Sequence, residues 1–321
     1  MYIFETYFLK IAMAYRKYAY PALLSLLIIP VLVFTCSNQD ENGNGNPSPH
    51  PDSLFSSPMS MGVVQNPAID EASGLACSRV NRGMLWTHND SGDKARIFLL
   101  TDSGKHVGEF HLRGAVARDI EDMAVGPGPE EGKSYIYLGD IGDNWAGHNI
   151  KLIYRFEEPD VSGRDLPVKD TIRQYDVIRL RYPDMNRDAE TLMVDPLTRD
   201  IYIVSKREPN VTAYRAPYPH DTENVTIMEK VGEMPLTMIV SGDISPDGRE
   251  ILLKSYNEAY YWKLSEGESV KDILNREPKL LPLAIEPQGE AIAWEADGLG
   301  YYTLSEEVFF IQAVLYYYQR K

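Results

Sequence analysis

Residues 290–305 read EAIAWEADGLGYYTLS, and this stretch contains the pattern that decides the fold. An acidic residue precedes a short apolar run, a turn containing Gly and Asp follows, and a second apolar run ends in polar residues. Short β-prone runs separated by such turns are typical of antiparallel hairpins. The first part of this unit recurs four more times along the chain, as SGLACS at Ser73, EDMAVGPGP at Glu121, ETLMVDPLT at Glu190 and GDISPDG at Gly242.

The spacing of the five copies predicts the architecture. They lie 48, 69, 52 and 48 residues apart, and each is followed by a second and a third apolar run. A fourth run follows the first four copies, and four-stranded units of about 40–50 residues are the blades of a β-propeller. The fifth copy reaches Lys321 without a fourth run, and the stretch from Met59 to Ile69 is a spare strand that can complete it. We therefore predict an all-β fold, a propeller of five four-stranded blades closed by an N-terminal strand.

Two other architectures fit the pattern less well. A sixth blade has room only between Phe156 and Tyr182, in the long second unit, which contains few strand-like runs. A β-sandwich or a pair of small β domains is the remaining alternative.

Composition excludes several classes of function. The chain of 321 residues has 47 acidic and 32 basic side chains, a formal net charge of −15. Because nucleic-acid phosphates require a basic face, we do not expect a nucleic-acid partner. No G-x-S-x-G elbow of a serine hydrolase and no H-E-x-x-H zinc motif occurs in the sequence.

The N-terminal residues predict an export signal. An apolar run, PALLSLLIIPVLVF, follows Arg16 and Lys17 and ends just before Cys36. It is shorter than the roughly 20 residues of a membrane-spanning helix and matches the core of a signal peptide. It resembles a lipoprotein signal sequence, in which Cys36 becomes the lipid-bearing first residue. A signal without lipidation and an uncleaved anchor are the alternatives.

This signal divides the chain into three parts. Residues 1–36 are the predicted signal peptide, residues 37–58 a disordered tether rich in Asn, Gly, Ser and Pro, and residues 59–321 the propeller. The prediction for location is secretion across the inner membrane, followed by lipid anchoring in the cell envelope at the outer membrane or cell surface. The membrane contact is thus expected to be the lipid.

The blade pattern gathers polar residues at one mouth of the central channel. Each first strand lines the channel, so Ser73, Glu121, Glu190, Gly242 and Glu290 are expected to be equivalent. The ends of the second strands, at Asn89, Asp140, Lys206, Lys254 and Glu306, form a second equivalent set. We predict that this mouth binds a polar ligand or a cation; its ligand-binding residues are Asn89, Asp90, Asp119, Glu121, Glu190, Lys206, Lys254, Glu290 and Glu306. The alternative is that wet strand ends simply tolerate charge.

A shorter motif occurs in two of the copies. Residues 118–121 and 187–190 share the pattern R-D-x-E, and on a strand its two acidic residues point to one face. Neighbouring carboxylates repel unless they share a proton or a cation. The motif therefore favours a metal ion or a protonated acid; hydrogen bonds between blades are the alternative.

Two loops have the inventory of a calcium site. Residues 89–93 read NDSGD and residues 139–144 read GDIGDN, which supplies carboxylate and amide oxygens on turns that Gly permits. The metal-ligand candidates are Asp93, Asp140, Asp143 and Asn144, and Ca²⁺ is the candidate cofactor. Neither loop has the EF-hand pattern, and both also suit plain hairpin turns. His88 is the candidate for a general base, with a hydrogen-bonded structural histidine as the alternative.

The strings LWTHNDSGD, RDIEDMAVGPGP and YIYLGDIGDN resemble secreted bacterial WD40/YVTN-like β-propeller proteins of uncharacterised function. The resemblance covers Glu71 to about Tyr318 and implies a propeller, without an established reaction. A more distant resemblance to phytase-like and phosphotriesterase-like propellers implies hydrolysis at a calcium-bearing mouth. We predict a monomeric envelope lipoprotein that binds a polar ligand or an envelope protein. A metal-dependent hydrolase and a purely structural lipoprotein are the alternatives.

Overall fold

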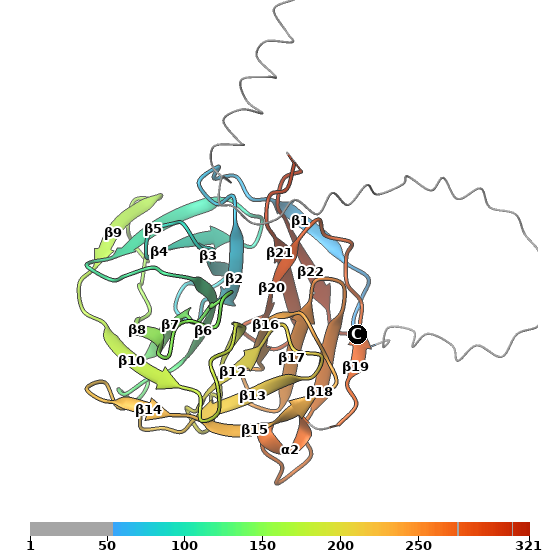
Figure 1. Cartoon of the computed structure of the whole chain (residues 1–321). Helices are drawn as coiled ribbons and strands as arrows, with labels where there is room; N and C mark the ends of the chain where they lie inside the picture. Colours follow the sequence, from blue (N-terminus) through green and yellow to red (C-terminus); the bar gives the residue numbers. More distant parts are fainter. Residues whose placement is uncertain (1–53, 275, 310) are drawn as a thin grey trace, which may run out of the picture. The chain divides into compact units, whose positions relative to one another are not determined.

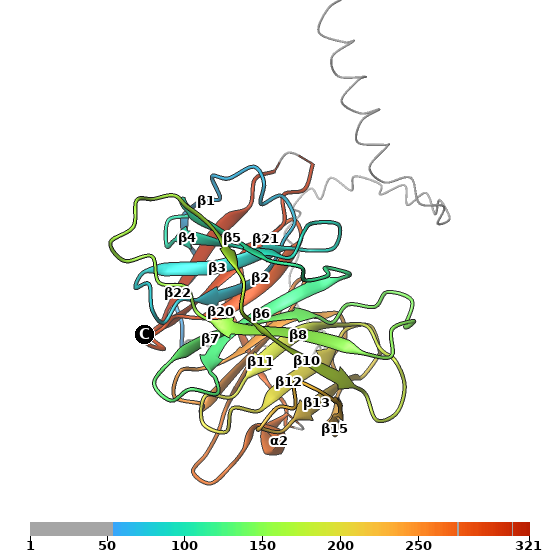
Figure 2. The same cartoon turned by 90° about the vertical axis from the view of Figure 1, so that its left-hand side faces the viewer.

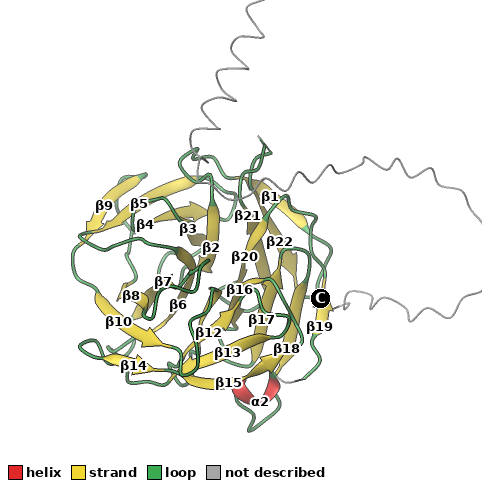
Figure 3. Ribbon diagram, in the orientation of Figure 1, coloured by secondary structure: helices red, strands yellow, loops and turns green. Residues whose placement is uncertain are grey.

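Five sheets surround a common axis, and each contains one copy of the sequence repeat (Figures 1 and 3). The computed structural model describes residues 54–274, 276–309 and 311–321. The predicted signal peptide with Cys36, and residues 37–53 of the predicted tether, lie outside the described residues. Within the described part, no helix has the length and apolarity needed to cross a bilayer. The prediction of an all-β, five-bladed propeller is confirmed.

The strands fall into five blades, each ordered here as it pairs. Blade 1 contains β2 (Ala72–Cys77), β3 (Met84–Asn89), β4 (Arg96–Thr101), β5 (His106–Leu112) and β9 (Val168–Ile172). Blade 2 contains β6 (Ile120–Pro127), β7 (Ser134–Asp140), β8 (Lys151–Glu157), β10 (Asp176–Arg181) and β14 (Val225–Ile227). Blade 3 contains β11 (Ala189–Val194), β12 (Ile201–Ser205), β13 (Val211–Ala216) and β15 (Glu229–Met234).

Blades 4 and 5 complete the ring. Blade 4 contains β16 (Ile239–Ile244), β17 (Glu250–Ser255), β18 (Ala259–Lys263) and β19 (Lys279–Leu281), with the short helix α2 (Val270–Ile273) between the last two strands. Blade 5 contains β20 (Gly289–Trp294), β21 (Gly300–Ser305), β22 (Val314–Gln319) and β1 (Met59–Val63). The innermost strands contact each other in the closed order β2, β6, β11, β16, β20 and back to β2.

The long second repeat extends two blades and does not form a sixth. Between Phe156 and Tyr182 the chain forms β9, which joins the outer edge of blade 1 in parallel with β5, and then β10, the fourth strand of blade 2. The short strand β14 joins β10 in parallel. Figure 1 shows β9 at the outer edge of blade 1 and β14 beside β10, and Figure 2 shows β8 and β10 of blade 2 on the side that faces the viewer. The six-blade alternative is therefore wrong for the described residues.

The N-terminal strand closes the ring as predicted. β1 pairs antiparallel with β22, and the register runs from Met59 opposite Tyr317 to Val63 opposite Val314. Ahead of β1, Phe55 forms a bridge with Arg320 and is 1% exposed. Its ring packs edge-on against Tyr301, with 5.1 Å between ring centroids, and lies beside Trp294. Residues 54–58, which the sequence assigns to the tether, thus include a residue of the core.

We expect Phe55→Ala to destabilise the domain by about 3–5 kcal/mol, the usual cost of removing a large buried aromatic side chain. The loss arises because Phe55 fills the space between blades 4 and 5, against Tyr261, Trp294 and Tyr301. Urea unfolding measures it. Met59→Ala, on the same closing segment but 41% exposed, is the control and should change the free energy of unfolding by less than about 0.5 kcal/mol. Equal effects of the two substitutions would contradict the packing role of Phe55.

Candidate functional site: an acidic channel mouth

A β-bulge interrupts every inner strand at the same end of the channel. In β6, β11 and β20 the extra residue is a glutamate, namely Glu121, Glu190 and Glu290. In β16 it is Val240, and β2 is irregular over Ser73 and Gly74. A bulge redirects its side chain relative to the regular pleat, and bulges are frequent beside functional sites. Gly242, predicted to be the blade 4 equivalent, lies two residues further along β16.

The bulges also shift the register of the second strands. The residues opposite the position before each bulge are Asn89, Asp140, Ser205, Ser255 and Ser305. Lys206 and Glu306 follow this position by one residue, and Lys254 precedes it by one residue. The predicted equivalent set therefore combined residues from three registers, and a shift of one residue along a strand changes the face to which the side chain points.

Seven carboxylates gather at this end of the channel. They form three overlapping groups, in each of which ligand atoms lie within 4.8 Å of one another. The groups are Asp90 with Glu290 and Glu306, Asp90 with Asp119 and Glu121, and Glu121 with Asp188 and Glu190. We call these seven residues the acidic mouth. Six are residues that the sequence predicts as ligand-binding, and whether they bind a ligand stays a prediction. Asp188 was recognised only as part of the R-D-x-E motif.

Burial and mutual repulsion perturb these acids strongly. Burial, reinforced by the charges of Glu190, Asp90 and Asp119, raises the pKa of Glu121 well above its ordinary value. Burial raises the pKa of Glu190 to about 8, against the opposing effect of Lys206. The pKa of Glu306 rises to about 9, again through burial and the neighbouring Glu290. Without a cation, this mouth therefore retains protons at neutral pH.

The same causes act on the outer acids of the group. Burial and the neighbouring Asp90 and Asp188 raise the pKa of Asp119 to about 6. Burial also raises the pKa of Asp90, partly offset by the hydrogen bond from the amide of Ser91. The raised pKa values therefore belong to acids of blades 1, 2, 3 and 5.

Few basic groups compensate this charge. Lys206 forms a buried ion pair with Glu190, and its ammonium lies 5.2 Å from the centre of the Tyr256 ring. Arg207 pairs with Asp188. Among the described residues these are the two ion pairs that the seven carboxylates form. The site is thus rich in oxygen ligands and short of positive charge.

The chain approaches the carboxylates closely at Gly142, in the loop after β7. A Cβ atom at this position would collide with carboxylate oxygens of both Glu121 and Asp119. The amide of Gly142 also donates to the carbonyl of Asp119, at 3.1 Å. Gly142, the second glycine of the GDIGDN string, thus lets the loop pass directly beside these two carboxylates.

The four predicted metal ligands of the loops lie outside the three groups, and each contacts other protein atoms. Asp93 accepts hydrogen bonds from Arg96 at 2.7 Å and from Asn89 at 3.0 Å. Asp140 pairs with Arg118 at 3.1 Å. Asp143 accepts from Lys151 at 2.9 Å, and Asn144 accepts from Arg207. These partners already use oxygens that a calcium ion would need.

Three further predicted residues lie beside the mouth. The side-chain amide of Asn89 donates to the carbonyl of Ala68, at 2.7 Å. Lys254 is fully buried, where it donates to the carbonyl of Gly289 at 2.6 Å and pairs with Glu286 at 3.3 Å. His88 is also fully buried, and burial lowers its pKa to about 4, so the ring is neutral at pH 7.

Two aspartates that the sequence did not single out connect neighbouring blades. The carboxylate of Asp122 accepts hydrogen bonds from the amides of Leu192 and Met123, both at 2.9 Å. Asp243 accepts from the amide of Trp294 at 2.9 Å. Asp122 lies one residue beyond the bulge of β6, and Asp243 lies three residues beyond the bulge of β16. Among the R-D-x-E acids, Asp188 also connects two blades, because it accepts the amide of Asp143 from the blade 2 loop at 2.8 Å.

Comparisons with known proteins give no family for the chain. No protein-family model matches it, and no curated protein is significantly similar. Among solved structures, a luciferin-regenerating enzyme matches with a TM-score of 0.44 and 11% identity, covering 82% of this chain and 95% of the other. A chain of a nidogen/laminin complex matches with a TM-score of 0.41 and 11% identity, covering 73% and 72%. The five-bladed architecture described above follows from the sheet topology alone.

We expect the metal-free protein to lose stability as the pH rises from 7 to about 9. Glu190 and Glu306 have folded-state pKa values of about 8 and 9, above the value near 4.3 of an unfolded glutamate, so proton binding favours the folded state. This contribution is complete below the unfolded pKa and disappears as the pH rises through the folded pKa. The unfolding temperature in EDTA measures it.

Glu190→Gln should flatten this pH profile, because an amide does not ionise. Glu266→Gln, on an exposed turn, is the matched control and should keep the wild-type slope. An unfolding temperature of the wild type that does not change across this window would contradict the raised pKa values.

Proposed function

We propose that the protein is a β-propeller binding module that holds a divalent cation, Ca²⁺ in the first place, at the acidic mouth. The observation that supports this proposal is the placement of glutamates on the bulges of three inner strands, within 4.8 Å of further carboxylates. Several buried carboxylates at this separation repel one another unless protons or a cation neutralise them. Ca²⁺ takes six to eight oxygen ligands, and carboxylates are its usual protein ligands.

The group of Glu121, Asp188 and Glu190 is the strongest candidate for the cation. All three side chains are buried, and they come from two adjacent blades, so the ring fixes their separation. A cation here would relieve the repulsion that raises the pKa of Glu121 and Glu190. A polar ligand would then reach the cation from the channel mouth.

The proposed setting is the cell envelope. The signal-like run before Cys36 supports secretion and lipid anchoring, and the tether-like composition up to residue 53 supports a domain held away from the membrane. In this setting the protein acts as a monomeric lipoprotein. Globomycin-sensitive labelling of Cys36 with a radioactive fatty acid, lost in Cys36→Ser, tests the anchor.

Titration calorimetry of the EDTA-treated protein with Ca²⁺, Mg²⁺ and Mn²⁺ tests the cation site. We expect a saturable heat for at least one of them, a raised unfolding temperature, and an affinity reduced about tenfold or more in Glu121→Gln, since carboxylate count sets the strength of such sites. Asp93→Asn is the matched comparison, because it changes a carboxylate of the loop set and lies outside the three groups.

Two results would contradict the proposal. One is the absence of both heat and thermal stabilisation with all three cations. The other is an unchanged affinity in Glu121→Gln together with a lost affinity in Asp93→Asn, which would assign the site to the loops.

The metal-dependent hydrolase predicted as the alternative would use the same carboxylates, so binding data do not separate it from a binding module. Its proposed base, His88, is fully buried and has no solvent-exposed surface from which to reach a substrate. This favours the binding module. Phosphoesterase and esterase activity that depends on the added cation and is lost in Glu121→Gln would favour the enzyme instead.

A further inference from the structure

Two neighbouring loops beside the acidic mouth display large apolar side chains. Residues 141–150 connect β7 to β8, and residues 182–188 connect β10 to β11, at the end of the ring where the bulges lie. Trp145 in the first loop is 87% exposed, and Met185 in the second is 62% exposed. Large apolar side chains that are exposed together in one patch are typical of interaction surfaces.

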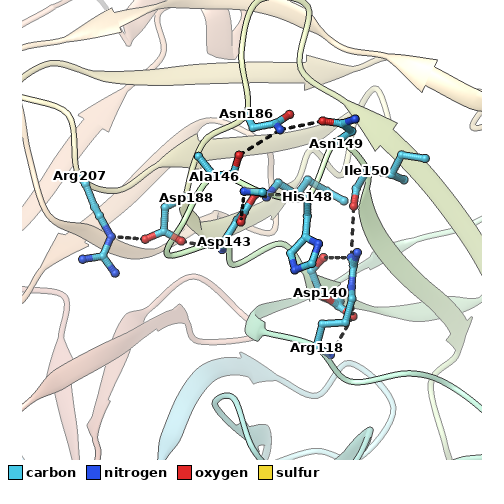
Figure 4. A network of polar contacts seen from close by, with 12 residues as sticks. Arg118, Asp140, Asp143, Ala146, His148, Asn149, Ile150, Asn186, Asp188 and Arg207 are labelled. Carbon is cyan, nitrogen blue, oxygen red and sulfur yellow. Dashed lines mark hydrogen bonds and ion pairs between the residues drawn. The ribbon is translucent and has the colours of Figure 1, made fainter. Parts of the chain in front are cut away.

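The loop that carries Trp145 is fixed by a polar network (Figure 4). The carboxylate of Asp143 accepts hydrogen bonds from the amides of Gly147 at 2.7 Å and His148 at 2.8 Å, and from Lys151 at 2.9 Å. The amide of Asp143 donates to Asp188 of the acidic mouth, at 2.8 Å. The backbone of the loop that carries Trp145 is therefore held in position, so binding at this loop costs little ordering of its backbone.

The same network joins the second loop to the first. The side-chain amide of Asn186 donates to the carbonyl of Ala146 at 3.1 Å and to Asn149 at 2.8 Å (Figure 4). Beside it lies a hollow of about 280 Å³, whose apolar lining includes Met185, Tyr182 and Ile227, the last at the end of β14 and 54% exposed. Polar and charged side chains line the rest of the hollow, namely Asn149, Arg181, Asp184 and Asn186. We call Trp145, Met185, Ile227 and this hollow the rim patch.

We propose that the rim patch docks a segment of a partner protein that carries Lys or Arg beside an apolar side chain. The apolar side chain packs against the exposed Met185 and Ile227 at the edge of the hollow, and the basic side chain lies over the Trp145 ring or toward the acidic mouth. Trp and Met are enriched at the centres of protein interfaces, and Trp is the aromatic side chain that attracts cations best. The proposal goes beyond cation binding, since it concerns side chains that bind no metal.

Charge decides between this partner and the other possible occupants. The chain has a net charge of −15, and the rim patch adjoins seven carboxylates with two basic partners. A second copy of the chain would present the same acidic face, and an anionic lipid surface would be repelled as well. A basic segment is attracted by the same field that opposes those occupants.

Selection of displayed 12-residue peptides on the full-length protein tests the proposal directly. We expect enriched peptides to contain Lys or Arg within two residues of Leu, Ile, Met or an aromatic residue, and their affinity to fall with rising salt. Trp145→Ala and Met185→Ser should each weaken binding about tenfold or more, as expected for residues at the centre of an interface. Leu197→Ser is the matched control, because Leu197 is 66% exposed on the β11–β12 turn at the opposite end of the ring.

Several outcomes would overturn the proposal. They are the enrichment of peptides without basic residues, the failure of any peptide to enrich, and equal binding by wild type and both rim variants. Self-association, or binding to vesicles that contain the anionic lipid phosphatidylglycerol, that Trp145→Ala abolishes would assign the patch to a second copy or to lipid. Calcium heats measured on Trp145→Ala separate this inference from the proposed function, because this variant leaves every carboxylate of the acidic mouth in place.

Discussion

The pairing of β1 with β22 is the constraint on which the rest of the structure depends. The outer strand of a propeller blade leaves an open edge, and a blade that contains strands from both ends of the chain ties the two ends of the ring together. Here β1 supplies that strand, and Phe55 fills the space beside Trp294 and Tyr301. Closure brings the inner strands of blades 1 and 5 into contact. Only then do Asp90 of blade 1 and Glu290 and Glu306 of blade 5 become one group.

Much of the fold could be predicted from the sequence because each blade is encoded locally. An apolar run, a turn with Pro, Gly or Asp, and a second apolar run specify a hairpin without reference to the rest of the chain. Repetition of the hairpin then predicts the number of blades, and the missing strand of the fifth copy predicts closure by β1. The long second unit was interpreted correctly as lacking a sixth blade, although its β9 joins blade 1 by a parallel pairing that no local pattern indicates.

The site was harder to predict, for two physical reasons. The copies of the repeat are short and differ in sequence, so their alignment did not fix the register to one residue. It gave Gly242 where the structure has Val240, and it gave Lys206 and Lys254 one residue to either side of the equivalent position. The loops show the second reason. Asp143 and Asn144 have the side chains of metal ligands, but Lys151 and Arg207 bond to them, and Arg207 comes from the next blade. The sequence shows which side chains carry ligand oxygens, but it does not show which of these oxygens already accept hydrogen bonds from basic side chains.

Asp188 connects the charge of the mouth to the shape of the rim. Its carboxylate accepts the amide of Asp143 and pairs with Arg207, while it also belongs to the group with Glu121 and Glu190. The position of the Trp145 loop therefore depends on a carboxylate that the mouth shares. An empty mouth binds protons, as the raised pKa values of Glu121 and Glu190 indicate, and the proposed cation would have to displace them. The protons, the proposed cation and the Trp145 loop would therefore compete for one set of carboxylate oxygens.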